Sequence, residues 1–413
     1  MLKKFLNKSL IIISLSAVFL SACGSTETEA EAKELLTPPP EEELQRFELP
    51  NGRTVKEDAT HMSVPGLLSQ DLEEFCRILD SMPNLNYVNL GNEDPEESSL
   101  TPEDVYYLIE NYPQIKFDYV FNVFGREISL DDDYLDLNHL QMDDNGKKLE
   151  GVLKCLRSLS YLDMDFCGVD NSVMERIRSE YPEAEVEWRI WFGENYSVRT
   201  DCERILASNP DLEVLSGNDL EVLKYCTKVK YLDIGHNEIT DVSFLAYMPE
   251  LYACIISINP WVDLSPISAC TKLDYLEIND SSCQDLSPLA SCTSLKHLNL
   301  CNLGEVTGWD ALLNLDSPER IRIGIYTKID DESLAALKSA FPDCDINTEA
   351  ADSDLSDWRW ITDPIRQPRY DQLFDEMGYN HYSSALSYYW NDPDYYPEGY
   401  VLIGESYPKY PEW

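Results

Sequence analysis

Residues 243–300 read SFLAYMPELYACIISINPWVDLSPISACTKLDYLEINDSSCQDLSPLASCTSLKHLNL, and the same residue types return along this stretch at a spacing of 22. The spacing extends upstream to residue 223, so four successive turns can be aligned. The aligned columns are Leu223, Leu245, Ile267 and Leu289; Cys226, Met248, Cys270 and Cys292; Val229, Leu251, Leu273 and Leu295; Leu232, Cys254, Leu276 and Leu298; and Ile234, Ile256, Ile278 and Leu300. Such agreement indicates an internal repeat, because a helical period would not produce it.

Each unit has the pattern L-x-x-L-x-L-x-x-N, whose alternating centre is typical of a short strand with one buried face. Asn237 and Asn259 stand at the same place in successive units, where a side chain can cap backbone groups in a tight turn. The return segments, such as VDLSPI and CQDLSPL, are too short for an α-helix and suit a 3₁₀ turn. The pattern resembles leucine-rich repeats. Over residues 220–303 the 22-residue form with D-x-S-P-L resembles the internalin subclass of bacterial surface proteins.

Longer units flank these repeats. Segments at helical spacing, from Thr101 to Tyr112 and from Asp170 to Tyr181, are each followed by Pro and then by a strand pattern. The phrases YPQIKFDYVFNVFG (112–125) and YPEAEVEWRIWFG (181–193) have Tyr-Pro pairs 69 residues apart. A unit with two strands and one helix has therefore been duplicated. Residues 330–347 repeat the helix–Phe-Pro–strand phrase once more.

We therefore predict an α/β fold: a right-handed leucine-rich-repeat solenoid of short parallel strands over residues 55–350. Its convex side should be α-helical in the N-terminal and last repeats and should carry 3₁₀ turns in the middle. The chain also resembles a family of repeat-containing lipoproteins of Firmicutes-type bacteria, in phrases such as WFGENYSVRTD (191–201) and LKYCTKVKYLDIGHNEITDVSFLAYMPEL (223–251). Members of that family have no assigned reaction, so this resemblance implies a fold and no chemistry.

The first 22 residues have the three parts of a secretory signal peptide. Three Lys within the first eight positions make a basic end, and the apolar run that follows is too short to span a bilayer comfortably. The closing LSAC (20–23) resembles a bacterial lipobox, which implies cleavage before Cys23 and lipid attachment to its sulfur. Residues 23–54 are rich in Glu, Thr and Pro and indicate an acidic tether between the lipid and the body.

The 413-residue chain carries 76 Asp and Glu against 32 Lys and Arg, a formal net charge of −44. Such acidity argues against nucleic-acid binding, because phosphate backbones select Lys and Arg. It also argues against docking of the folded body on an anionic membrane. We therefore expect contact with the membrane through the lipid anchor only, on the extracytoplasmic face of a bacterial cell membrane.

Residues with catalytic or ligating chemistry form no known motif. The sequence has no G-x-S-x-G, H-E-x-x-H or phosphate loop, and its five His are scattered. Acidic runs such as residues 131–133 lack the ligand order of an EF-hand loop. We therefore predict no enzymatic activity, no catalytic residue, no metal site and no cofactor.

Twelve cysteines would suggest disulfides in an exported chain. Cys226, Cys254, Cys270 and Cys292 nevertheless replace aliphatic residues in inward columns, where a thiol behaves as a small hydrophobe. The register thus favours core packing. A Cys270–Cys292 disulfide stays conceivable, because residues one rung apart lie about 5 Å from each other.

The residues between the aliphatic columns should point outward on the concave face, because side chains alternate along a strand. A row of Tyr beside a row of Asp and Glu offers stacking faces and hydrogen-bond acceptors that suit a protein or peptide with Lys and Arg, or a glycan. Tyr could equally stand there for its strand propensity. The candidate ligand-binding residues are Tyr161, Asp163, Tyr231, Asp233, Tyr275, Glu277, Asn279, His297 and Asn299.

Residues 351–413 are rich in Trp and Tyr. They could form a cap and tail on the last repeat, as such arrays need, or could present aromatic side chains to a glycan. We interpret the chain as a monomeric, non-enzymatic binding module for a protein or polysaccharide at the cell surface. Two alternatives remain. One is a structural or assembly partner of another envelope protein, acting through the aromatic tail, and the other is an enzyme whose catalytic part is the carboxyl-terminal segment.

Overall fold

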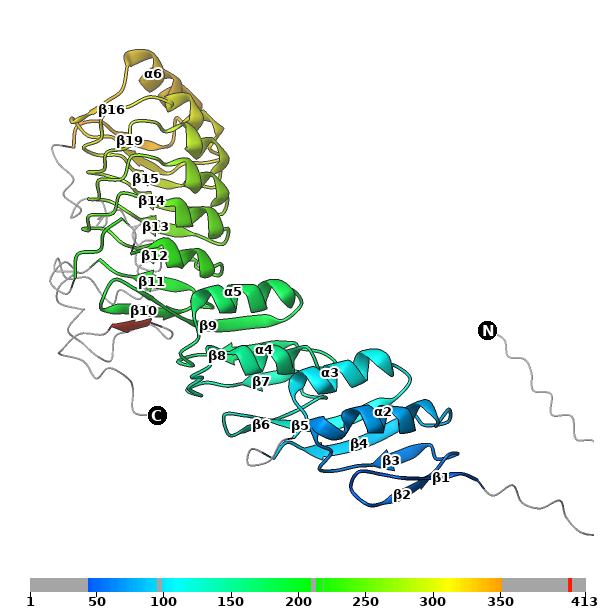
Figure 1. The fold of residues 1–413 in the computed structure, drawn as a ribbon. Coiled ribbons are helices and arrows are strands. Elements are labelled where there is room, and N and C mark those ends of the chain that lie inside the picture. The colour runs from blue at the N-terminus through cyan, green and yellow to red at the C-terminus, as the bar shows by residue number, and fades with distance from the viewer. Residues whose placement is uncertain (1–43, 95–98, 209–212, 218, 351–399, 403–413) are drawn as a thin grey trace, which may run out of the picture.

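The computed structural model describes residues 44–94, 99–208, 213–217, 219–350 and 400–402. The described chain is an elongated array of stacked repeats, with the first repeats at one end and the last repeats at the other (Figure 1). The predicted signal peptide, Cys23 and all of the predicted cap and tail except residues 400–402 lie outside the described residues.

The middle repeats build one parallel sheet of short strands. These are β11 (Arg204–Leu206), β12 (Tyr231–Asp233), β13 (Ala253–Ile255), β14 (Tyr275–Glu277), β15 (His297–Asn299), β17 (Arg320–Arg322) and β19 (Asp345–Asn347). They follow one another in chain order across the sheet. From β12 to β15 the register advances by 22 residues at each step, from Leu232 to Cys254, Leu276 and Leu298. The predicted columns are therefore the rungs of this sheet, and the leucine-rich-repeat solenoid is confirmed.

A buried asparagine closes the turn after the strand. The Asn259 amide nitrogen donates to the carbonyls of Ile234 (2.9 Å), Ile256 (3.3 Å) and Ser257 (3.1 Å). Its side-chain oxygen accepts from the backbone N–H of Ile239 at 3.0 Å. Asn237 occupies the same place one turn earlier, with carbonyl partners at 2.9–3.0 Å. The amide thus bonds both to its own turn and to the preceding repeat, as capping of a tight turn requires.

The recurring Asp of the D-x-S phrase starts the return segment of each unit. The backbone N–H groups of Ser243, Ser265 and Ser287 each donate to the Asp carboxylate two residues earlier, at 2.8–2.9 Å. This Asx turn leads into a 3₁₀ helix, the form that short helical segments of a few residues commonly take. The 3₁₀ helices are η1 (Ser69–Asp71), η2 (Glu221–Tyr225), η3 (Ser243–Tyr247), η4 (Ser265–Ala269), η5 (Ser287–Ser291) and η6 (Trp309–Asn314).

The longer repeats carry α-helices, as predicted for the two ends of the array (Figure 1). They are α2 (Leu72–Asp80), α3 (Pro102–Asn111), α4 (Lys147–Leu153), α5 (Asn171–Glu180) and α6 (Asp331–Ala340). Helix α3 begins with a capping box in which Thr101 and Asp104 satisfy each other's backbone N–H groups. Helix α6 is capped by Asp330, whose carboxylate accepts from the N–H of Ser333 at 2.7 Å.

Upstream of the seven-stranded sheet lie two smaller sheets. The first has β3 (His61–Ser63), β4 (Tyr87–Asn92), β5 (Lys116–Val123) and β6 (Arg126–Ser129). The second has β7 (Tyr134–Asp136), β8 (Tyr161–Met164), β9 (Glu185–Phe192), β10 (Tyr196–Arg199) and β20 (Tyr400–Leu402). The pairs β5–β6 and β9–β10 are antiparallel, so each duplicated unit ends in a hairpin and interrupts the expected run of parallel strands. The repeated Phe-Gly phrase supplies the turn: Gly125 and Gly193 have φ of 90° and 61°.

Ordered structure also begins earlier than the expected boundary at residue 55. Strands β1 (Arg46–Glu48) and β2 (Thr54–Lys56) form an antiparallel hairpin in front of the first repeat. Phe47 and Val55 pack against the core from this hairpin, which explains why it is held. A separate two-stranded sheet, β16 (Gly304–Glu305) and β18 (Thr327–Lys328), lies beside the last repeats.

We predict that Asn259→Ala lowers the free energy of unfolding by about 1–3 kcal/mol, because the N–H of Ile239 and several carbonyls lose a buried partner. Urea denaturation followed by circular dichroism measures this change. Asn111→Ala, at an exposed helix end, is the matched control and should change stability by less than about 0.5 kcal/mol. Equal losses in the two variants would contradict a special role for the turn asparagine.

Candidate functional site

The predicted ligand-binding row takes its expected place on the seven-stranded sheet, but it is buried. Tyr275 pairs in register with His297, and Glu277 pairs with Asn299. The exposed fractions are Tyr231 9%, Asp233 1%, Tyr275 0%, Glu277 0%, Asn279 0%, His297 1% and Asn299 0%. These side chains therefore form no open surface in this structure, and their part in ligand binding stays a prediction.

Contacts among the row's own members contribute to this burial. The Tyr275 hydroxyl donates to the Glu277 carboxylate, and the Tyr275 and His297 rings lie 6.0 Å apart. The carboxyl-terminal strand lies next to β11, the first strand of this sheet. Strand β20 pairs antiparallel with β10, Ser197 opposite Val401, and lies against β11. The chain thus leaves the seven-stranded sheet at β19 and returns to the strand at its opposite edge.

An open surface lies on the second upstream sheet, on the face opposite to α4 and α5. Leu162 and Val186 point toward those helices and are buried, so Tyr161 and Asp163 lie on the opposite face. We call the aromatic side chains of this face the aromatic strip; they are Tyr134, His139, Tyr161, Phe166 and Trp191. Tyr134 and Trp191 are 62% and 40% exposed.

The rings of the aromatic strip pack on one another in rungs. Tyr134 and Tyr161 are paired in register on β7 and β8, and their rings stack at 4.6 Å with an interplanar angle of 11°. The His139 and Phe166 rings stack at 5.1 Å, and Phe166 meets Trp191 edge-on at 6.2 Å. His139 and Phe166 both have φ near 60°, at the turn after their strands. The rings are therefore held in place by the repeat geometry and present one side to solvent.

A network of ion pairs lies beside the aromatic strip. Arg189 donates to both oxygens of Asp165, at 2.7 and 3.0 Å. Arg199 donates to Asp163 at 2.9 Å and to Asp201 at 3.0 Å. Burial by itself lowers the pKa of Arg199, but hydrogen bonds and charge from Asp201 and Asp163 outweigh it and raise that pKa above its ordinary value. Asp163, one of the predicted ligand contacts, thus already forms an ion pair within the protein.

Tyr161, the other predicted residue on this sheet, is half-buried at the edge of the network. Burial, together with the nearby Asp163 carboxylate, raises the pKa of its hydroxyl to about 12. The hydroxyl is therefore neutral at physiological pH and donates to Asp163 at 3.1 Å. Tyr161 can offer its ring face to a ligand, while its hydroxyl is already engaged.

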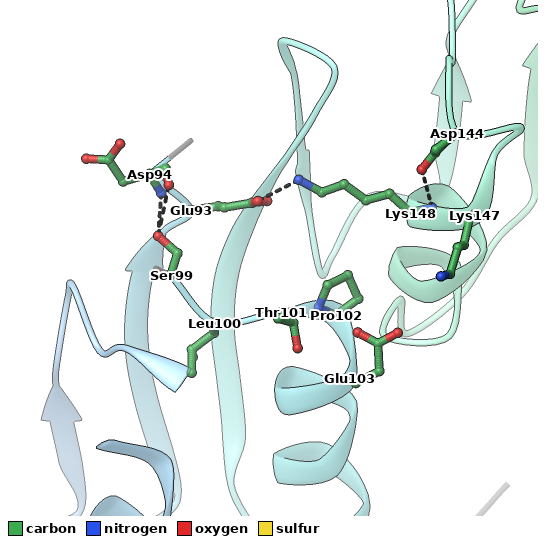
Figure 2. Close-up of a pocket in the computed structure, with 10 residues that line it drawn as sticks. All are labelled: Glu93, Asp94, Ser99, Leu100, Thr101, Pro102, Glu103, Asp144, Lys147 and Lys148. Atoms are coloured by element: carbon green, nitrogen blue, oxygen red, sulfur yellow. Dashed lines mark hydrogen bonds and ion pairs between the residues drawn. The ribbon is translucent and has the colours of Figure 1, made fainter. Parts of the chain in front are cut away.

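A cavity of about 410 Å³ opens where the repeat with α3 meets the repeat with α4 (Figure 2). The end of β4 and the starts of α3 and α4 surround it. Lys148 bonds to Glu93 at 2.5 Å and to the Asn122 carbonyl at 2.6 Å, and the backbone N–H of Lys148 donates to Asp144. Thr101 belongs to the capping box described above. Because these polar groups form hydrogen bonds and an ion pair with one another, we interpret the cavity as a polar contact region between repeats and not as a ligand site.

The described residues contain no group of three or more His, Cys, Asp or Glu side chains that could hold a metal ion. Over the same ranges, no helix is both long and apolar enough to cross a membrane. The described cysteines are all free, and most are buried. Burial raises the pKa of Cys270 and of Cys292 to about 12, and each thiol donates to a carbonyl of the preceding repeat at 3.4 Å. The core-packing interpretation is confirmed for them.

We predict that Arg189→Ala lowers the free energy of unfolding by about 3 kcal/mol, because the buried Asp165 carboxylate loses its two-pronged partner and keeps only Arg199, at 3.6 Å. Arg189→Lys should lose less, since it keeps the charge and loses only the two-pronged geometry. Both changes are measured by urea denaturation at neutral pH. An Arg189→Ala protein as stable as the parent would mean that the pair contributes nothing to this part of the fold.

No family model matches the sequence, and no curated protein matches it. Solved structures do match. An internalin (InlF) of Listeria monocytogenes is 13% identical, over 75% of this chain and 70% of its own, with a TM-score of 0.29. A leucine-rich-repeat protein of Leptospira interrogans is 16% identical, over 66% of this chain and 74% of its own, with a TM-score of 0.30.

A third match is the leucine-rich-repeat ectodomain of a plant membrane receptor kinase from Arabidopsis thaliana, solved in complex with CASPARIAN STRIP INTEGRITY FACTOR 2. It is 13% identical, over 70% of this chain and 32% of its own, with a TM-score of 0.25. The strand register, the turn asparagines and the 3₁₀ returns make this chain a leucine-rich-repeat protein.

Proposed function

We propose that this protein is a non-enzymatic binding module, anchored by lipid at Cys23 on the extracytoplasmic face of a bacterial membrane. It recognises a protein or a glycan on the exposed face of the solenoid. Leucine-rich-repeat solenoids are typical protein-binding modules, because stacking of repeats creates a long surface of regularly spaced side chains. The aromatic strip carries the proposal: it exposes stacked rings whose positions the strands fix.

The chemistry of the aromatic strip suits binding. Aromatic side chains supply large contact areas with little loss of conformational freedom, and they are enriched at interfaces. The exposed rings of Tyr134 and Trp191 lie on neighbouring parts of one sheet face, over strands held by the ion pairs of Arg189 and Arg199. A ligand would therefore meet a rigid surface. The alternative, assembly through the tail, has less support, since its described part, β20, already pairs with β10 of the same chain.

We predict that Tyr134→Ala with Trp191→Ala abolishes ligand binding by the chain that starts after Cys23. Removing both exposed rings deletes most of the contact area of the aromatic strip, for a loss of about 2 kcal/mol or more. The measurement is a screen of glycans and purified envelope proteins, followed by affinity determination for each hit.

Tyr107→Ala is the matched control, because Tyr107 is 49% exposed on α3, away from the aromatic strip. Hits that bind the double variant and the parent equally would overturn the placement of the site on the aromatic strip. Circular dichroism of all variants separates loss of binding from loss of fold.

We predict that Cys23→Ala abolishes lipid attachment, because the thiol that would carry the acyl group is gone, and that the variant chain without residues 1–22 leaves the membrane fraction. Incorporation of a clickable palmitate analogue, followed by detergent phase partitioning, measures this. Cys76→Ala, in the body, is the control and should leave the labelling unchanged. A Cys23→Ala protein that is still labelled and still membrane-bound would refute the lipid anchor.

A further inference from the structure

The face of the aromatic strip already holds one cation of its own. The Arg189 guanidinium lies 4.4 Å from the centre of the Phe166 ring. Its two donor nitrogens engage the Asp165 carboxylate at 2.7 and 3.0 Å. A ring face and a carboxylate together therefore hold a guanidinium here, by the cation–π attraction and by a two-pronged ion pair.

A second set of the same groups stands one rung away, at Tyr134, Tyr161 and Asp136. The two tyrosine rings stack at 4.6 Å, and Tyr134 is 62% exposed. Asp136 is two residues after Tyr134 on β7, so its carboxylate lies on the same face of the sheet. Asp136 is exposed, and within the described ranges no Lys, Arg or His lies at ion-pair distance from it. This set has the ring and the carboxylate, and its nearest described cation, Arg199, lies at the Tyr161 hydroxyl and is already paired with Asp163 and Asp201.

The exposed charges around this set are mainly negative, since Arg199 is mostly buried in its own ion pairs. Asp133 is exposed just before β7, and the exposed Glu185 is paired in register with Tyr161. Among the described residues, the cation that pairs with Glu185 is Lys228. It is shared with Glu187, to which it lies closer (2.9 against 3.8 Å). The whole chain carries a net charge of −44, so the surrounding field also favours a basic partner.

We propose that Tyr134, Tyr161 and Asp136 bind a Lys or Arg side chain of an extended partner polypeptide. This inference rests on the proposed function and narrows its ligand to a basic protein segment. The partner's cation lies over the exposed ring of Tyr134 and pairs with the Asp136 carboxylate, as Arg189 does with Phe166 and Asp165. A neutral glycan could stack on the rings and donate hydroxyl groups to Asp136, but it carries no positive charge to balance the acidic side chains here, which is why a basic polypeptide fits better.

The test uses fluorescence anisotropy with three labelled peptides: alternating Gly and Lys, alternating Gly and Arg, and a neutral counterpart of alternating Gly and Gln. The chain that starts after Cys23 should bind both basic peptides and not the neutral one. Asp136→Asn and Tyr134→Ala should each weaken the binding by about threefold or more. Raising the salt from about 0.01 M to about 0.15 M should weaken binding by the parent more than by Asp136→Asn.

Two control variants separate local recognition from diffuse attraction. Glu110→Gln removes the same charge, and Tyr107→Ala a similar exposed ring, both from α3. Both should bind the basic peptides as the parent does. If Glu110→Gln weakens binding as much as Asp136→Asn, the attraction is only that of the overall negative charge, and the inference is wrong.

The remaining outcomes separate this inference from the proposed function. In one outcome, basic and neutral peptides bind alike or no peptide binds, while Tyr134→Ala with Trp191→Ala still abolishes binding of a glycan or protein hit. The proposed binding function is then supported, and the inference of a basic partner is wrong. If the double variant leaves every hit unchanged, and the Asp136→Asn variant leaves peptide binding unchanged, both are overturned.

Discussion

The fold depends on one constraint: each short repeat must satisfy its buried backbone groups with the help of the next. A repeat of 22 residues has a three-residue strand and one 3₁₀ helix, and it has no room for a helix with complete internal hydrogen bonds. Asn259 solves this by bonding across to Ile234 in the preceding repeat. Asn237 makes the equivalent bond to Ala207 one turn earlier. Bonds of this kind keep neighbouring strands from slipping, so the columns of side chains stay in line.

The alignment of columns also creates the candidate site. When Tyr134 and Tyr161 occupy the same rung position on neighbouring strands, their rings are brought to stacking distance without any special contact. The turn after the strand does the same for His139 and Phe166, whose left-handed backbone turns both side chains to one face. The ion pair between Arg189 on β9 and Asp165, just after β8, then links these two neighbouring strands. The exposed aromatic surface thus follows from the register of the repeats. Such a surface can be used for binding.

Much of the fold followed from periodicity, because the 22-residue columns, the helix at residues 101–112 and the strand Tyr161–Met164 each have a strong local pattern. The candidate site could be predicted from the sequence less well than the fold. Alternation along a strand shows which face Tyr275 is on and not what else lies against that face, so its burial could not be foreseen. Tyr134 was missed because it precedes Tyr161 by 27 residues rather than 22 and so falls outside the aligned columns. Its own phrase, YLDLN (134–138), contains the signal that could have found it.

The pairing of β20 with β10 changes how this array is expected to assemble. In an ordinary solenoid each repeat touches only its neighbours, so folding can start anywhere and the ends can fray independently. Here Tyr400 pairs with Val198, a contact between residues 202 positions apart in the chain. Such a bond closes only after the intervening repeats are in place, because loop closure of that length is slow before they form. Pairing of the carboxyl-terminal strand therefore requires the downstream repeats to be folded. It makes folding of the array cooperative, where an ordinary solenoid can fold repeat by repeat.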